Sequence, residues 1–208
     1  MKKLKLTLIG LISMFAINTT NAQVFSEGDK IIDVYYGFPN LYKIAFKTSY
    51  ANSGQELNLN VGGVGPLGIR GEYMVADKVG VGVDIGFSNT KITYQENDNF
   101  GEGSESQIYE YNYNTKKLGV MVTFNYHFVE NSDNFDAYFT LGAGYGNRTF
   151  GSSSTDPDFG TVTFNSPFPV AARVGVGMRY FFNENIGVNL GIGLGQGGLL
   201  NGGLSFKL

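Results

Sequence analysis

The stretch Val79-Gly-Val-Gly-Val-Asp-Ile-Gly-Phe87 alternates strictly between apolar residues and a second set made of glycine and aspartate. A period of two residues predicts a β-strand, because successive side chains of a strand point to opposite faces. A soluble sandwich also alternates, but its polar face points to water and seldom consists mainly of glycine. The pattern therefore predicts a strand with lipid on its outside and a small polar interior, as in a transmembrane β-barrel.

The amino terminus has the features of a secretory signal peptide. Three lysines within the first five residues precede an apolar run from Leu6 to Ile17, and a short polar stretch ends at Ala22. The alternative is a membrane anchor, but the run is shorter than the roughly 18 apolar residues of a spanning helix. We expect residues 1–22 to be a cleaved signal and residues 23–208 to form one outer-membrane barrel domain.

Composition excludes several classes of protein. The absence of cysteine rules out disulfides, thiolate metal sites and a lipoprotein anchor. Leaving out the three lysines of the signal reduces the 15 basic residues to 12, against 18 acidic residues. Nucleic-acid binding calls for a basic face, so we expect no nucleic-acid partner.

Eight segments share the alternation and are joined by alternately long and short connections. They run over 32–38, 67–75, 79–87, 118–128, 135–145, 170–180, 186–194 and 204–208. There are three long connections. The first follows residue 38 and ends at about Gly65, and the others cover Ser88–Lys116 and Asn147–Pro167. No outward set contains a charge, and a Lys or Arg at the bilayer midplane would cost roughly 2 to 4 kcal/mol. The fold class is thus all-β, an eight-stranded antiparallel up-and-down transmembrane barrel, and its short turns and both termini are expected in the periplasm.

The signal, the glycine-rich alternation after the tight turns (Val79–Phe87 and Ile186–Leu194) and the terminal Leu204-Ser-Phe-Lys-Leu208 resemble the small porin-like outer-membrane β-barrel family of Gram-negative bacteria, the OmpA/OmpX-like eight-stranded barrels. The resemblance covers essentially all of the mature chain. It implies a monomer in contact with outer-membrane lipid and lipopolysaccharide, inserted by the outer-membrane assembly machinery. One departure is that such barrels usually end on an aromatic residue, whereas this chain ends on Leu208 with Phe206 two positions before it.

Inward-facing polar side chains are expected to form a network that fills the lumen, since an eight-stranded barrel is just wide enough to be filled by its own side chains. The members are Arg70, Glu72, Asp84, Lys117, His127, Asp136, Arg173 and Arg179. If Val75 pairs with Val79, Arg70 faces Asp84; if Phe128 pairs with Phe135, His127 faces Asp136. If Tyr180 pairs with Ile186, Arg179 faces Gly187 and Arg173 faces Gly193. The alternative to a filled lumen is a water path or a small-ligand cavity.

Two kinds of chemistry have weak support. His127 has Asp136 as its expected partner and Thr123 as the closest hydroxyl on its face, and no serine follows it in the strand, so an ion pair is favoured over a catalytic dyad and no enzyme is expected. Acidic residues of the second long connection (Glu96, Asp98, Glu102 and Glu105) do not match an ordered calcium loop. We expect no metal and no cofactor.

The long connections are the candidates for function. Tyr94, Tyr109, Tyr111 and Tyr113 are expected to extend strands beyond the membrane and to offer an edge or an aromatic surface to a partner. A structural or surface-interaction role is therefore favoured. The alternative is a narrow passive pore for small solutes or a binder of a small lipidic ligand.

Overall fold

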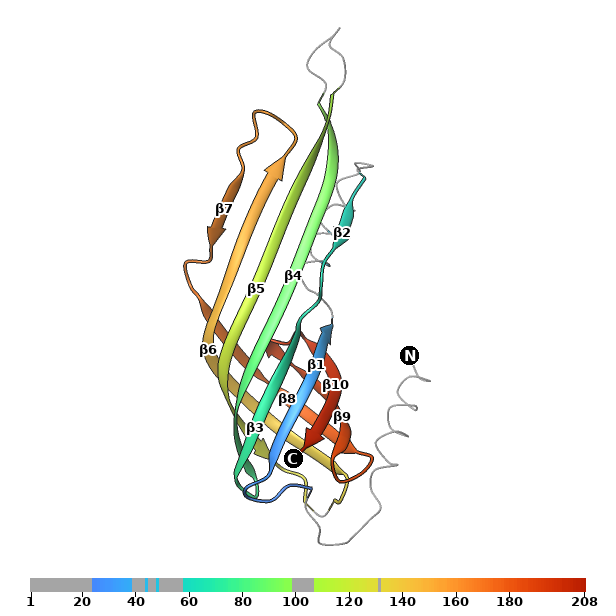
Figure 1. Cartoon of the computed structure of the whole chain (residues 1–208), viewed down its shortest axis with the longest axis vertical. Coiled ribbons are helices and arrows are strands. Elements are labelled where there is room, and N and C mark those ends of the chain that lie inside the picture. Colours follow the sequence, from blue (N-terminus) through green and yellow to red (C-terminus); the bar gives the residue numbers. More distant parts are fainter. Residues whose placement is uncertain (1–23, 39–43, 45–47, 49–57, 99–106, 131) are drawn as a thin grey trace.

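One antiparallel β-sheet, closed into a barrel, contains the strands of the described part of the chain (Figure 1). The computed structural model describes residues 24–38, 44, 48, 58–98, 107–130 and 132–208. Within them the barrel strands are β1 (Lys30–Phe38), β3 (Leu67–Ala76), β4 (Val79–Asp98), β5 (Gln107–His127), β6 (Phe135–Ser154), β8 (Val170–Phe181), β9 (Ile186–Gly195) and β10 (Leu200–Lys207). Each of the eight pairs with the next, and β10 pairs with β1 to close the ring. The predicted eight-stranded up-and-down barrel is confirmed. No helix in these described ranges is long and apolar enough to cross a bilayer.

The outward faces of the barrel strands are apolar and exposed, as their sequence pattern predicts. Val83 is 45% exposed, Leu141 57% and Leu190 57%, whereas inward-facing Met121 and Asp84 are buried. A row of exposed aliphatic and aromatic side chains would be costly in water, but it matches the hydrocarbon of a membrane.

Three strands continue far beyond the barrel. β4, β5 and β6 have 20, 21 and 20 residues, about twice the 10 residues of β3 and of β9. Two short strands flank them, because β2 (Asn60–Gly62) pairs with β4 and β7 (Val162–Asn165) pairs with β6. We call this five-stranded projecting sheet the extension: β2, β7, residues 88–98 of β4, 107–117 of β5 and 147–154 of β6. Figure 1 shows it rising from one side of the barrel.

The extension corrects the prediction that Ser88–Lys116 and Asn147–Pro167 are loops, since most of their described residues are strand. The polar composition of these segments, which by itself favours a loop, belongs to strands that lie above the membrane. The period of two in fact persists, and the ladder between β4 and β5 continues without a break from Val79↔Tyr126 to Asp98↔Gln107.

Two of the three predicted registers are wrong by two residues. His127 lies opposite Tyr138 and not opposite Asp136, because the turn closes with Phe128 N–H donating to Ala137 O. In the second pair of strands, Arg179 faces Asn189 and Arg173 faces Gly195, since the turn closes with Phe182 N–H donating to Ile186 O. A shift of two keeps every side chain on its face, so the lumen assignments survive.

The third predicted register is present over most of its length. Arg70 pairs with Asp84 as expected. An irregularity between Met74 and Ala76 brings Ala76, and not Val75, opposite Val79.

Candidate functional site

The lower half of the lumen is organised by Arg179 of β8. Its guanidinium donates to Asp33 Oδ2 at 2.8 Å and to Glu72 Oε2 at 2.6 Å, and it lies 3.5 Å from Asp136 Oδ2. Ser205 Oγ donates to Asp33 Oδ1 at 2.6 Å. Five strands thus converge on one buried cation, and we call this group with His127 and Asn125 the lower network.

His127 belongs to the same network. Its Nδ1 lies 2.8 Å from Asp136 Oδ1, and its Nε2 lies 3.0 Å from Glu72 Oε1. Asn125 Nδ2 also donates to Glu72 Oε1, at 2.6 Å. The predicted contact of His127 with Asp136 is therefore made diagonally, despite the different register. Each ring nitrogen is thus within hydrogen-bond distance of a carboxylate, and neither is free to activate a hydroxyl.

A phenylalanine near the amino terminus seals the lumen below this network. Phe25 is 2% exposed and packs edge-on against Phe181, with ring centroids 5.5 Å apart, and against His127 at 5.7 Å. The backbone around it is tied to the last strand, since Lys207 Nζ donates to Val24 O at 2.7 Å and lies 2.8 Å from Asp29 Oδ2. This end of the barrel is thus closed by its own chain.

A second group, the upper network, surrounds Asp84. Asp84 Oδ2 accepts from Arg70 Nε at 2.9 Å, and Asp84 Oδ1 accepts from Tyr35 Oη at 2.8 Å and from Gln196 Nε2 at 2.8 Å. Arg70 also lies over the ring of Tyr35, 4.0 Å from its centroid. Arg173 joins the group by donating to the backbone carbonyl of Gln196.

The turn between β9 and β10 closes the lumen from above. Gly195, Gly197 and Gly198 have φ values of 107°, 88° and 77°, a left-handed conformation that glycine adopts without the strain a Cβ would add. This conformation folds the turn inward, and Gln196 is 4% exposed. This turn is therefore a plug of the barrel.

The predicted lumen residues divide between these groups, with one exception. Arg70, Asp84 and Arg173 lie in the upper network, and Glu72, His127, Asp136 and Arg179 lie in the lower one. Lys117 faces inward but lies above the Gln196 plug, at the base of the extension. Sequence reasoning missed Phe25 and Gln196, because the alternation of the strands carries no information about segments outside them.

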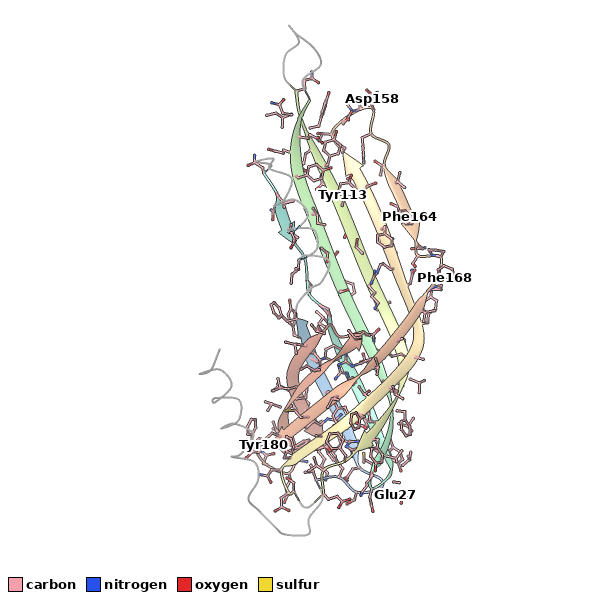
Figure 2. All side chains as sticks on the ribbon, turned by 180° about the vertical axis from the view of Figure 1, so that it is seen from behind. Glu27, Tyr113, Asp158, Phe164, Phe168 and Tyr180 are labelled. Atoms are coloured by element: carbon pink, nitrogen blue, oxygen red, sulfur yellow. The ribbon has the colours of Figure 1, made fainter. Side chains whose placement is uncertain are left out.

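The extension inverts the polarity of the barrel. Its outer face, which continues the lipid-facing rows, carries polar side chains: Asn89, Lys91, Thr93, Gln95 and Asn97 on β4, and Lys116, Asn114, Asn112 and Glu110 on β5. Some bond across strands, as Thr93 Oγ1 does to Asn112 Oδ1 at 2.7 Å. Since the three rows turn polar directly after Phe87, Leu118 and Tyr145, we place the upper edge of the membrane just above these residues. Phe168, which is 80% exposed, lies where barrel and extension meet (Figure 2).

The upper part of the inner face of the extension is aromatic. Tyr94 stacks on Tyr111 and on Tyr113, with ring centroids 5.3 and 6.0 Å apart, and Phe150 stacks on Phe164 at 5.1 Å. Figure 2 shows Tyr113 and Phe164 in this part of the molecule, far from Glu27 and Tyr180 at the other end. The predicted tyrosines do extend the strands, although Tyr109 does not join the stack and bonds to Gln107 Oε1. Glu102 and Glu105 lie outside the described residues.

Comparison with known proteins agrees with this architecture. The family model of the outer membrane protein beta-barrel domain matches residues 11–203. The chain belongs to this family. It is therefore an outer-membrane protein, while the family description names no specific role. No curated protein sequence matches the chain.

Several solved barrels are similar to this family member. The N-terminal β-barrel domain of OprF from Pseudomonas aeruginosa is 14% identical, with a TM-score of 0.46, 88% of this chain covered and 100% of that chain. OprG from Pseudomonas aeruginosa is also 14% identical, with a TM-score of 0.46 and coverage of 90% and 99%. Ail, the attachment invasion locus protein of Yersinia pestis, is 13% identical, with a TM-score of 0.43 and coverage of 88% and 99%.

Proposed function

We propose that this protein is a membrane-anchored display platform, whose extension contacts a macromolecular partner outside the cell while both termini lie in the periplasm. The observation that carries the proposal is the contrast between a lumen closed at both ends and a sheet that projects with reversed polarity. Recognition is commonly built on segments that a rigid scaffold positions, and the closed barrel is such a scaffold.

The free edge of the extension gives the partner a chemical description. In the described part of the chain, β7 pairs only with β6, and all four of its residues are exposed. An exposed strand edge presents unpaired N–H and C=O groups that accept a further strand. Val162 and Phe164 on the inner face provide apolar contacts for alternate side chains of that strand. We therefore propose an extended polypeptide segment as the partner.

The orientation has a direct test, because the natural chain has no cysteine. Asn112→Cys on the outer face of the extension should react with a membrane-impermeant maleimide on intact cells. Glu130→Cys, at the short-turn end, should react only after the outer membrane is permeabilised. Labelling in the reverse pattern would overturn the proposed orientation.

The interaction has a separate test. Extended peptides selected from a random library against the purified barrel in detergent should bind the intact protein. They should lose binding when Val162–Asn165 of β7 is replaced by a flexible linker, while the altered barrel remains folded by circular dichroism. Equal binding to the altered barrel would contradict the proposal.

A narrow passive pore, or a lumen that binds a small lipidic ligand, is the second candidate. Its support is a set of buried polar atoms without a hydrogen-bond partner, among them Arg173 Nε and Asn189 Oδ1, which are positions suited to water. Steady open-pore conductance of the intact protein in planar bilayers, unchanged by shortening the extension, would favour this candidate. We expect no such conductance.

A further inference from the structure

Two lysines lie close together on the outer face of the extension, just above the barrel. Lys116 of β5 lies opposite Asn89 of β4, and Lys91 of β4 lies opposite Asn114 of β5, so the two lysines are diagonal neighbours. Diagonal neighbours of an antiparallel pair are about 7–8 Å apart, which is within the combined reach of two lysine side chains. Both side chains are exposed. Their ammonium groups can therefore contact the same ligand.

The height of the two lysines matches the headgroup layer of a membrane. Lys116 is two residues beyond Leu118 and Lys91 is four residues beyond Phe87, after which the outer rows turn polar. These intervals are about 7 and 13 Å along the strands, and less along the membrane normal because barrel strands are tilted. The polar layer of one leaflet is about 5–8 Å thick, and a lysine side chain can bend toward it. Both ammonium groups thus reach the level of lipid headgroups.

The charge of this pair is not neutralised by the protein. Among the described residues, neither Lys91 nor Lys116 has a carboxylate within 4.0 Å, whereas Lys78 and Lys207 at the other end of the barrel each have one. On the described outer rows of β4 and β5 the first carboxylate is Glu110, six residues above Lys116. The outer face just above the membrane therefore carries a local excess of positive charge, which attracts anions.

The surface beside the lysines has room for a ligand. A Cβ added at Gly62 of β2, which lies opposite Lys91, would meet no heavy atom within 4 Å. At the other end of this row Gly151 of β6 lies opposite Asn114, and the nearest heavy atom to a Cβ there would be Thr163 Oγ1 at 3.8 Å. The absence of side chains at both ends leaves space for a headgroup next to the lysines.

The two asparagines can contribute neutral hydrogen-bond donors. The side-chain oxygens of Asn89 and Asn114 are buried without a hydrogen-bond partner. Each side chain can therefore present only its amide nitrogen, which is a donor, to a ligand on the outer face. Donors alone suit a ligand that consists of acceptors, such as a phosphoryl group.

We propose that Lys91 and Lys116 bind the phosphoryl headgroup of a lipid in the outer leaflet, with Asn89 and Asn114 as additional donors. The lysine ammonium groups supply charge-assisted hydrogen bonds to the phosphate oxygens. The apolar row that begins at Leu118, which is 55% exposed, contacts an acyl chain of the same lipid. The site does not depend on the polypeptide partner proposed above, because it lies on the outer face and not at the edge of β7. Its assignment to the outer leaflet rests on the proposed orientation, which the cysteine labelling tests separately.

Lipid A, the lipid part of lipopolysaccharide, is the probe in its diphosphoryl and dephosphorylated forms. The intact mature protein in detergent micelles should retain diphosphoryl lipid A in native mass spectrometry. The double variant Lys91→Gln/Lys116→Gln should retain at least tenfold less, and each single variant an intermediate amount. Lys117→Gln is the matched control, because it removes the same charge from the inner face one residue away, and it should retain as much as wild type. Wild type should retain dephosphorylated lipid A only as weakly as the double variant retains the diphosphoryl form.

Thermal unfolding separates binding from a structural role. Without lipid A, the double variant should unfold at the wild-type temperature. Diphosphoryl lipid A should raise the unfolding temperature of wild type and of Lys117→Gln, since a ligand that binds only the folded state stabilises it, and it should not raise that of the double variant.

Two results would overturn the site. The first is equal retention of diphosphoryl lipid A by wild type and the double variant, and the second is retention by wild type that does not depend on the phosphoryl groups. Complete displacement of lipid A by inorganic phosphate at constant ionic strength would overturn the assignment to a lipid, in favour of a soluble phosphorylated solute.

Discussion

The barrel and the extension share β4, β5 and β6, but the rows of these strands have opposite polarity in the two regions. Within the membrane the outer rows of β4, β5 and β6 are apolar and the inner rows hold ion pairs, whereas above it the outer rows hold Asn, Thr and Lys and the inner rows hold stacked rings. The ladder between the strands is continuous across this change. Backbone pairing is therefore indifferent to the medium, while the side chains of each row match the medium that they face.

The largest effect should come from removing the cation of the lower network. Arg179→Ala leaves Asp33, Glu72 and Asp136 buried together without the guanidinium that bonds or neutralises them. Breaking a buried pair in this way typically costs about 3 to 5 kcal/mol. Urea unfolding in detergent measures the loss. Lys91→Ala on the outer face of the extension is the matched control and should be nearly neutral, so equal losses would contradict a special role of the buried Arg179.

The second largest effect should come from an arginine placed on the outer face, which the extension should tolerate and the barrel should not. Val83→Arg places a cation in a lipid-facing row at mid-depth, where the expected cost is about 2 to 4 kcal/mol, and Val174→Arg is equivalent. Thr163→Arg on the outer face of β7 should be tolerated. The yield of folded protein in outer-membrane fractions measures this. Equal yields would contradict the proposed membrane boundary.

The coupling of Arg70 to Asp84 should be the next largest effect. Arg70→Ala alone leaves Asp84 with only the neutral donors Tyr35 and Gln196, whereas the double change to Ala removes the carboxylate as well. We expect the single variant to be less stable than the double variant, with a coupling energy of about 0.5–3 kcal/mol. A double-mutant cycle by thermal unfolding measures it. Additive losses would show that the two side chains do not interact.

The smallest effect should come from the exposed pair Lys78 and Glu130 at the short-turn end. The hydrogen bond between them raises the pKa of Lys78 and lowers the pKa of Glu130. The contribution of Glu130 is therefore present above its unfolded pKa and lost as the pH falls through its lowered folded value. The contribution of Lys78 is lost as the pH rises through its raised value. Glu130→Gln should flatten the acid limb of a stability profile slightly, and 1 M salt should remove the difference.

The sequence predicts the fold well because one kind of information, a period of two, decides it. The number of barrel strands, their faces and the strand residues that line the lumen follow from the alternation alone, and errors of two residues in register leave the faces intact. Hence Arg179 is correctly placed inside, although its neighbour across the ladder is Asn189 and not Gly187.

The remaining features depend on closure in three dimensions. Phe25 enters the lumen only because Lys207, on the last strand, holds the backbone of Val24. Gln196 reaches Asp84 only because three glycines of positive φ fold their turn inward. The length of β4, β5 and β6 above the membrane could not be predicted for another reason. Their outer rows are polar there, and a search for rows of apolar, lipid-facing residues does not detect such strands.

The pairing of β1 with β10 joins the first barrel strand to the last. This pairing has a consequence for insertion into the membrane. The carboxylate of Asp33 on β1 accepts hydrogen bonds from Ser205 on β10 and from Arg179 on β8. It therefore lacks these partners until the carboxyl-terminal strands have been inserted. A partly inserted sheet would hold that bare charge at the depth of the bilayer, which is unfavourable. The seam therefore makes insertion nearly all-or-none. A chain truncated before Leu200 should fail to accumulate in the membrane at all, and not accumulate as a stable seven-stranded sheet.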